Sequence, residues 1–195
     1  FIENSFLATL PEREMLSGFA EMIKHGLIAD AAYYQELKNS DYRQISAQAI
    51  YHSVKIKNEV VLTDPFEKGL RKILNFGHTI GHAVEGYALV NDKKPLTHGE
   101  AIAIGMACEA YLSAKYCNLS SAELDEIAAY ILSLYPKYHI KPASFDDLMV
   151  LMQSDKKNED GFILFSLLDQ IGKCVFNCKA TKEDIFNSLT YYNSL

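Results

Sequence analysis

The chain has 195 residues, enough for one domain with a hydrophobic core, and its share of apolar residues (49%) and charged residues (23%) is typical of a globular protein. Its formal net charge of −6 argues against nucleic-acid binding, which needs a basic face, and no apolar run is long enough to cross a membrane. A local cluster of Lys and Arg can still bind a small anionic substrate, whatever the net charge.

Apolar spacing predicts a series of helices in the first half of the chain. These helices cover about 12–27, 31–37, 46–62 and 70–87. Pro11 and the acidic residues after it favour the start of the first helix, because acidic groups stabilise the positive end of a helix. Thr63, Asp64 and Pro65 end the third helix.

The second half begins with a helix that is apolar nearly all round. Thr97 and Glu100 have the spacing of a capping box, and the residues that follow, 101–117, are expected to form the buried centre of the domain. Further helices are expected at about 121–135 and 145–152 and from 181 onward, with a small β-hairpin formed by 162–168 and 173–176. No repeat and no glycine-rich phosphate loop is present. The predicted fold class is mainly α: a helical, bundle-like domain with a small β-hairpin near the C-terminus.

The four cysteines, Cys108, Cys117, Cys174 and Cys178, include no C-x-x-C pair. Cys174 and Cys178 flank a β-like stretch and are a candidate metal pair. Reduced thiols of a cytoplasmic protein, half of them in core positions, are the favoured alternative. Because the chain has no initiator Met and begins in an apolar segment, we expect it to be part of a longer protein.

Three histidines are candidates for metal binding. His78 and His82 lie four residues apart on one helix face, a common arrangement for holding a transition metal, although a pair of core or surface histidines is the alternative. Gly77 and Gly81 each cost the helix roughly 1 kcal/mol relative to Ala, which predicts close approach of a neighbouring helix or a ligand. His98 falls in the first turn of a helix, where the dipole favours a neutral ring, or else in an exposed loop.

Two further groups of polar residues point to a binding cleft. Glu21 and Lys24 lie at i and i+3 among apolar residues, which favours a partly buried functional pair over a surface pair. Arg71 and Asn75 continue the line of His78 and His82 as one polar stripe, and a guanidinium and an amide in line are typical of an anion clamp. A solvated helix face is the alternative. Nearby His25 points in a different direction and is interpreted as structural.

Three segments resemble, in order and spacing, the signature segments of the 3-dehydroquinate synthase family. They are GFAEMIKHGLIAD, EKGLRKILNFGHTIGHAVE and LTHGEAIAIGM. The resemblance implies that residues 1–195 form one helical metal- and substrate-binding domain. It also implies that an N-terminal α/β domain, which binds NAD, is absent from this chain, so no NAD-binding residue is expected here.

The resemblance also assigns the metal ligands. It gives Glu21, His78 and His98 to Zn²⁺ (or Co²⁺), in place of the His78–His82 pair that spacing alone favours. His82 then becomes a polar contact to the substrate and a proton carrier. Three protein ligands leave an open position for a substrate oxygen, as a catalytic zinc site requires.

The remaining roles follow by the same match. Lys57, Arg71 and Asn75 are expected to hold the substrate carboxylate and nearby hydroxyls. Lys24 is expected to contact a substrate hydroxyl, and Glu67 to orient the basic residues. A phosphate contact is assigned to the pair Lys156–Lys157, with Lys156 favoured.

The implied reaction converts a sugar phosphate, 3-deoxy-arabino-heptulosonate 7-phosphate, to 3-dehydroquinate and phosphate in the shikimate pathway of aromatic amino acid biosynthesis. NAD transiently oxidises a ring alcohol, phosphate leaves by β-elimination, and an aldol step closes the carbocycle. We expect a cytoplasmic homodimer, and an isolated chain that is inactive without its NAD domain. The alternatives are another sugar-phosphate cyclase, a metal-dependent polyol dehydrogenase on the same scaffold, and a non-catalytic helical interaction module.

Overall fold

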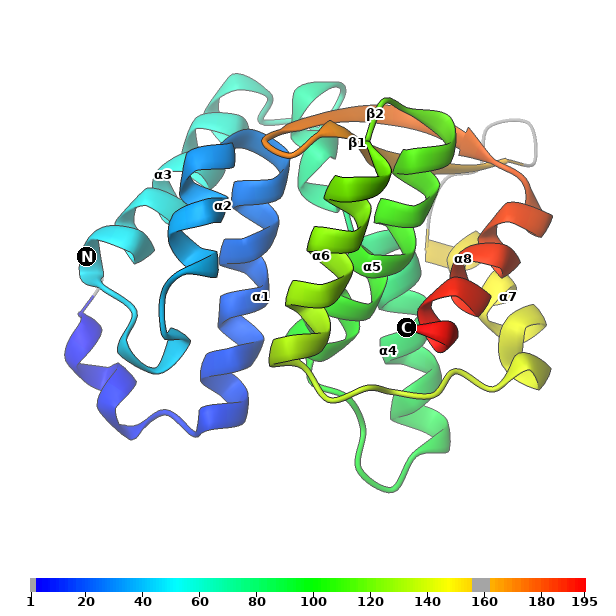
Figure 1. The fold of residues 1–195 in the computed structure, drawn as a ribbon, viewed down its shortest axis with the longest axis horizontal. Helices are drawn as coiled ribbons and strands as arrows, with labels where there is room; N and C mark the ends of the chain where they lie inside the picture. Colours follow the sequence, from blue (N-terminus) through cyan, green and yellow to red (C-terminus); the bar gives the residue numbers. More distant parts are fainter. Residues whose placement is uncertain (1–2, 156–161) are drawn as a thin grey trace.

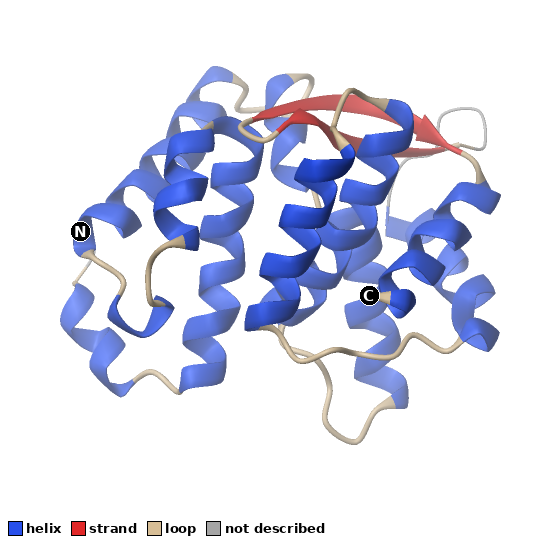
Figure 2. Ribbon diagram, in the orientation of Figure 1, coloured by secondary structure: helices blue, strands red, loops and turns tan. Residues whose placement is uncertain are grey.

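The computed structural model describes residues 3–155 and 162–195, which form a helical domain with one two-stranded sheet (Figures 1 and 2). The predicted fold class is confirmed. The α-helices (α), 3-10 helices (η) and strands (β) are η1 Asn4–Thr9, α1 Glu12–Ala29, α2 Ala31–Lys38, η2 Tyr42–Gln44, α3 Ala47–Thr63, η3 Leu70–Asn75, α4 His78–Asn91, α5 His98–Tyr116, α6 Ser121–Leu134, η4 Pro142–Ser144, α7 Phe145–Asp155, β1 Ile163–Gln170, β2 Lys173–Ala180 and α8 Lys182–Ser194. Within the described residues, every helix is too short or too polar to cross a bilayer.

Helix α5 lies at the centre, as its all-round apolar pattern predicts, and packs against α1, α4, α6, α8 and β1 (Figure 1). Nearly all of its residues from Gly99 to Ser113 are buried. The predicted capping box is present: Thr97 Oγ1 accepts from the Glu100 backbone N–H, and the Glu100 carboxylate accepts from the Thr97 N–H. Glu100 also pairs with Arg13 through two hydrogen bonds of 2.8 and 2.6 Å, which ties α1 to the start of α5.

The hairpin lies across one end of the helices and anchors η3 (Figure 1). Strands β1 and β2 are antiparallel, from Ile163 opposite Ala180 to Gln170 opposite Lys173. Ser166 of β1 donates its hydroxyl to the Lys72 carbonyl of η3 at 2.6 Å. The hairpin therefore holds in place the short helix that follows α3.

The prediction of one continuous helix over 70–87 is wrong. The chain forms the 3-10 helix η3, breaks at Phe76 and Gly77, and starts α4 at His78. Gly77 has a φ of +78°, a left-handed conformation that glycine adopts at little cost. Arg71 and Asn75 therefore lie on a different helix from His78 and His82, and the expected polar stripe is divided in two.

The backbones of α4 and α5 touch, which accounts for the glycines near the histidines. A Cβ built at Gly105 would lie 1.9 Å from the Gly77 carbonyl oxygen, and one at Gly81 would lie 2.8 Å from the Ile102 side chain. Of the two partners considered from sequence, a neighbouring helix is the one found. Helix α1 is as close to α5, because a Cβ at Gly99 would lie 2.2 Å from the Ser17 carbonyl oxygen.

Candidate metal and substrate site

The structure brings eight of the ten sequence-predicted site residues to one hollow of about 270 Å³. It is lined by Glu21, Lys24, Lys57, Glu67, Arg71, Leu74, Asn75, His78 and His98. His82 lies beside it, with its ring centroid 5.1 Å from that of His78 and 5.8 Å from that of His98. Lys156, the expected phosphate contact, lies outside the described residues.

Glu21 from α1 faces two imidazoles from α4 and α5. Its Oε1 lies 3.4 Å from His78 Nε2 and 3.7 Å from His98 Nε2, and it is buried with no hydrogen-bond partner. A buried carboxylate oxygen without a partner is costly. Ligands at about 2.1 Å from a tetrahedral Zn²⁺ lie roughly 3.4 Å from one another. The three donor atoms therefore fit a divalent metal ion placed between them.

The two imidazoles are oriented by hydrogen bonds to their other nitrogen. His78 Nδ1 lies 3.1 Å from the Phe76 carbonyl oxygen, and His98 Nδ1 lies 3.2 Å from Oε2 of Glu85 on α4. A proton on Nδ1 leaves the Nε2 lone pair directed at Glu21, as in many metal sites. No motif in the sequence marks Glu85, although it follows His82 at i+3 on the same helix.

The electrostatics of the three residues differ with their burial. Burial, together with the charge of Lys24, lowers the pKa of His78 to about 3, so this ring is neutral. Burial alone would raise the pKa of Glu21, but His98, Lys24 and His78 together hold it well below its usual range. The carboxylates of Glu21 and Glu85 raise the pKa of His98, which outweighs the opposite effect expected from the helix dipole. A bound cation would compete with that proton.

His82 also lies close enough to the other two histidines to be a ligand of the same metal ion. The candidate ligand atoms of His78, His82 and His98 all lie within 4.8 Å of one another, and in the part of the chain described they form the one such group of three or more. The geometry therefore accommodates both the His78–His82 pair and the Glu21–His78–His98 set. The four cysteines are free thiols, of which only Cys108 is fully buried, and none belongs to such a group.

Basic groups line the same hollow as the candidate metal ligands. Lys24 is only 3% exposed, and its Nζ donates to Oε2 of Glu21 at 2.7 Å, the second oxygen of the candidate ligand. Burial lowers the pKa of Lys24, although Glu21 opposes this effect. Lys57 lines the hollow from α3 and is exposed. These groups, with Arg71, make a local cationic surface in an acidic protein.

Arg71 is held by the loop between α3 and η3. The Asp64 carboxylate accepts hydrogen bonds from the backbone N–H groups of Lys68, Gly69 and Arg71 at 3.0, 2.7 and 3.1 Å. Arg71 Nη1 donates to the Pro65 carbonyl at 2.9 Å. Asp64 was predicted only as a helix stop, and its role in shaping this loop was not recognised from sequence.

Asn75 and Glu67 form a pair in the same hollow. Asn75 Nδ2 donates to Oε1 of Glu67 at 2.7 Å. Glu67 has a φ of +56°, which is unfavourable for a residue with a side chain. This bond fixes the amide of Asn75 in the hollow that Arg71 also lines, and a guanidinium and an amide together suit a carboxylate.

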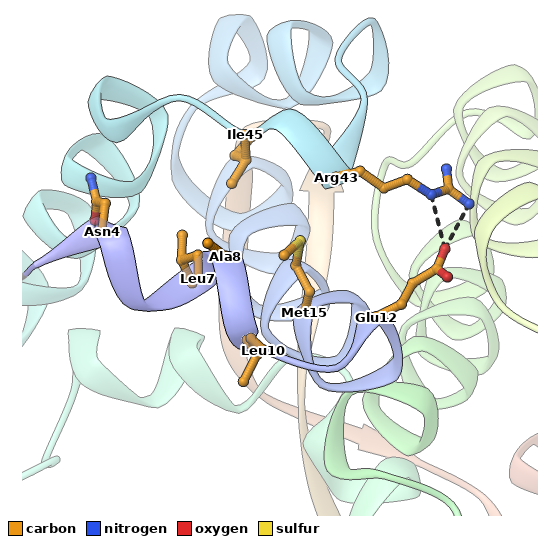
Figure 3. A pocket seen from close by; sticks show the side chains of 8 residues that line it. All are labelled: Asn4, Leu7, Ala8, Leu10, Glu12, Met15, Arg43 and Ile45. Atoms are coloured by element: carbon orange, nitrogen blue, oxygen red, sulfur yellow. Dashed lines mark hydrogen bonds and ion pairs between the residues drawn. The ribbon is translucent and has the colours of Figure 1, made fainter.

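Two larger hollows lie elsewhere in the part of the chain that the structure describes, and neither is lined by any of the ten residues that the resemblance assigns to the site, although Cys174 borders one of them. One of about 410 Å³ lies beside η1 and is bordered by the ion pair of Glu12 and Arg43 (Figure 3). The other, of about 560 Å³, lies between α3, η3 and the hairpin turn. The hollow of about 270 Å³ that contains Glu21, His78 and His98 differs from both in its chemistry, because it combines candidate metal ligands with basic groups.

Similarity to known proteins agrees with the resemblance. A family model described as 3-dehydroquinate synthase C-terminal matches residues 18–158. The 3-dehydroquinate synthase of Parabacteroides distasonis is 41% identical over 197 residues, which cover 98% of this chain and 55% of that protein. The enzyme of the same name from Halalkalibacterium halodurans is 38% identical over 193 residues, which cover 93% of this chain and 51% of that protein. The chain thus spans about half the length of these curated relatives.

The fold of the chain is also similar to that of a solved structure. The chain is similar to 2-epi-5-epi-valiolone synthase from Streptomyces hygroscopicus subsp. jinggangensis 5008, solved with NAD⁺ and Zn²⁺ bound, with a TM-score of 0.76 and 28% identity. The similarity covers 99% of this chain and 55% of that one. With the family model matching most of its length, the chain belongs to the 3-dehydroquinate synthase C-terminal family.

Proposed function

We propose that this chain is the metal- and substrate-binding domain of a 3-dehydroquinate synthase. Residues 1–195 act as one domain of a longer, cytoplasmic, homodimeric protein whose other domain binds NAD. The intact protein converts 3-deoxy-arabino-heptulosonate 7-phosphate to 3-dehydroquinate and phosphate. The assignment is supported by relatives of this name that are about twice as long as the chain.

The observation that carries the proposal is the unpartnered oxygen of Glu21 between His78 and His98. These three residues would hold Zn²⁺ or Co²⁺. When bound, the ion polarises the substrate alcohol that NAD oxidises. Lys24 holds the second Glu21 oxygen and so keeps the first one directed at the two rings.

The chain's own polar groups bind and orient the substrate. Arg71, Asn75 and Lys57 bind its carboxylate and adjacent hydroxyls, and Lys24 contacts a further hydroxyl. His82, beside the two other rings, holds or moves a proton at its imidazole. Glu67 orients the basic residues of the hollow and, through its hydrogen bond, Asn75. Lys156, outside the described residues, is assigned to the phosphate.

Metal binding by the full-length protein tests the ligand set. Glu21→Gln and His78→Ala should each weaken zinc binding by at least tenfold in calorimetry and lower the zinc content in elemental analysis. His139→Ala, a change at an exposed histidine far from the hollow in sequence, is the matched control and should bind like the parent. A His78→Ala protein that binds zinc as tightly as the parent would remove His78 from the ligand set.

Substrate choice tests the reaction. The similarity to a valiolone synthase favours a second candidate, a cyclase that acts on a heptulose phosphate without a carboxylate. The full-length protein should release phosphate from the heptulosonate phosphate and leave the heptulose phosphate unchanged, because Arg71, Asn75 and Lys57 suit a carboxylate. The opposite preference would replace the proposed reaction with the second one.

A further inference from the structure

A carboxylate is buried in the middle of the central helix, outside the hollow. Glu109 of α5 is fully buried, although most of its neighbours on that helix are apolar. Burying a carboxylate is costly unless hydrogen bonds compensate for the lost water. Its Oε2 accepts from the Gly77 backbone N–H at 2.7 Å, and its Oε1 accepts from the Ile80 N–H at 3.0 Å. Both partners lie at the start of α4.

Helix α4 has no capping side chain of its own. The first N–H groups of an α-helix lack partners within the helix, and a Ser, Thr, Asp or Asn at the N-cap usually satisfies one of them. The N-cap of α4 is Gly77, which has no side chain. Glu109 takes over this function from the neighbouring helix, and its charge also suits the positive end of the α4 dipole.

The same peptide group connects Glu109 to the metal site. The Gly77 N–H that donates to Glu109 belongs to the same planar peptide unit as the Phe76 carbonyl. In a trans peptide these two groups point in opposite directions, and the Phe76 oxygen lies 3.1 Å from His78 Nδ1. A rotation of this peptide would move the carbonyl that sets the tautomer and ring direction of His78.

We infer that Glu109 is a positioning residue for the metal site. It fixes the Phe76–Gly77 peptide, and that peptide directs His78 Nε2 toward Glu21. The inference rests on the proposed function, because it assumes that His78 binds a metal ion. Glu109 itself is too deep in the helix packing to touch the substrate: its contacts run to the back of the α4 N-terminus.

The test is Glu109→Gln in the full-length protein. Glutamine has the same shape but only one acceptor oxygen, and its NH₂ group would face a backbone N–H. We expect zinc affinity to fall by about tenfold, at the low end of losses seen when groups supporting a metal ligand are removed. Amide hydrogen exchange at Gly77 and Ile80 should become faster, and the visible absorption of bound Co²⁺ should change. Glu109→Asp, which keeps the charge, should give a smaller loss and replaces the first variant if that one does not fold.

Ser113→Ala is the matched control. Ser113 lies one turn further along α5 and is equally buried. It accepts from the Leu168 N–H of the hairpin at 2.9 Å and donates its hydroxyl to the backbone carbonyl of Glu109 at 2.6 Å, so these bonds run to β1 and within α5 and leave the Glu109 carboxylate untouched. This change should lower stability and leave zinc affinity and Co²⁺ absorption as in the parent.

The outcomes separate the inference from the function on which it rests. Unchanged zinc affinity in Glu109→Gln, or an equal loss in Ser113→Ala, would overturn the positioning role of Glu109 alone. Unchanged exchange at Gly77 would overturn it as well, and this measurement needs no metal. A parent protein that binds no metal would refute the proposed function together with the inference.

Discussion

Neighbouring polar residues on α1 have different environments. Glu21 and Lys24 face the hollow, whereas His25 points into the core, where its Nδ1 lies 2.7 Å from Ser53 Oγ. Its Nε2 is buried without a hydrogen-bond partner. Burial, with the nearby charge of Lys24, lowers the pKa of His25 from 6.5 to about 4. These contacts agree with the interpretation of His25 as structural.

His25 should make stability depend on pH. Between pH 6.5 and about 4 the unfolded chain binds a proton at His25 and the folded chain does not, so acidification favours unfolding. The free energy of unfolding does not depend on His25 above pH 6.5 and should fall by about 3 kcal/mol as the pH approaches 4. Urea unfolding at pH 7 and pH 4.5 would measure it. His25→Asn, which can keep the bond to Ser53, should show a smaller decrease, and an equal decrease would contradict the assignment.

At the scale of elements, the contact between α4 and α5 leaves no room for a side chain. Gly105→Ala would place a methyl group against the Gly77 carbonyl and should lower the free energy of unfolding by at least about 3 kcal/mol, or prevent folding. Gly18→Ala in α1 is the control, because nothing lies within 4 Å of its added methyl group. It should stabilise the protein by about 1 kcal/mol. Equal effects of the two changes in thermal unfolding would contradict the close packing.

The loop before η3 should affect substrate binding and leave metal binding unchanged. Asp64→Ala removes the acceptor of three backbone N–H groups around Arg71. In the full-length enzyme we expect KM for the anionic substrate to rise about tenfold, equivalent to about 1.4 kcal/mol, with zinc affinity as in the parent. Asp41→Ala is the control, because Asp41 accepts from the Arg43 N–H in a similar short helix away from the hollow. A loss of zinc affinity in Asp64→Ala would show that the loop supports the metal side instead.

Most elements were predictable because their signals are local. A helix start is marked by a capping residue and by the apolar periodicity that follows it, and both lie within one short segment of sequence. The capping residues are Ser46, Thr97, Ser120 and Thr181. The break between η3 and α4 was missed for the opposite reason. The conformation of Gly77 is held by Glu109 from another helix, and no pattern near residue 77 indicates that contact.

At the scale of the whole molecule, the sequence was enough to propose the candidate ligands. It was not enough to predict the residues that hold those ligands in position. Resemblance gave Glu21, His78 and His98 as candidate metal ligands, and the fold brings them together from three helices. Glu85 and Glu109 act across space on residues far from them in the chain, so neither spacing nor residue type singled them out.

The isolated chain should be inactive, because the proposed NAD domain lies outside it. Purified residues 1–195 mixed with zinc, NAD and the heptulosonate phosphate should release no phosphate, measured by a colorimetric assay. The full-length protein under the same conditions is the control. Turnover by the isolated chain would refute the division of functions between two domains.

The wide separation of the three candidate ligands along the chain bears on when a metal ion can be captured. Closing the long loops between them costs chain entropy, and the fold recovers that cost only when α1, α4 and α5 are packed together. The ion would then bind to the folded domain and stabilise it, and it would not nucleate folding. By mass action, free metal at 100 times its dissociation constant would add about 2.7 kcal/mol to the free energy of unfolding, and it would link α1 to α4 and α5, which lie far from it in the sequence.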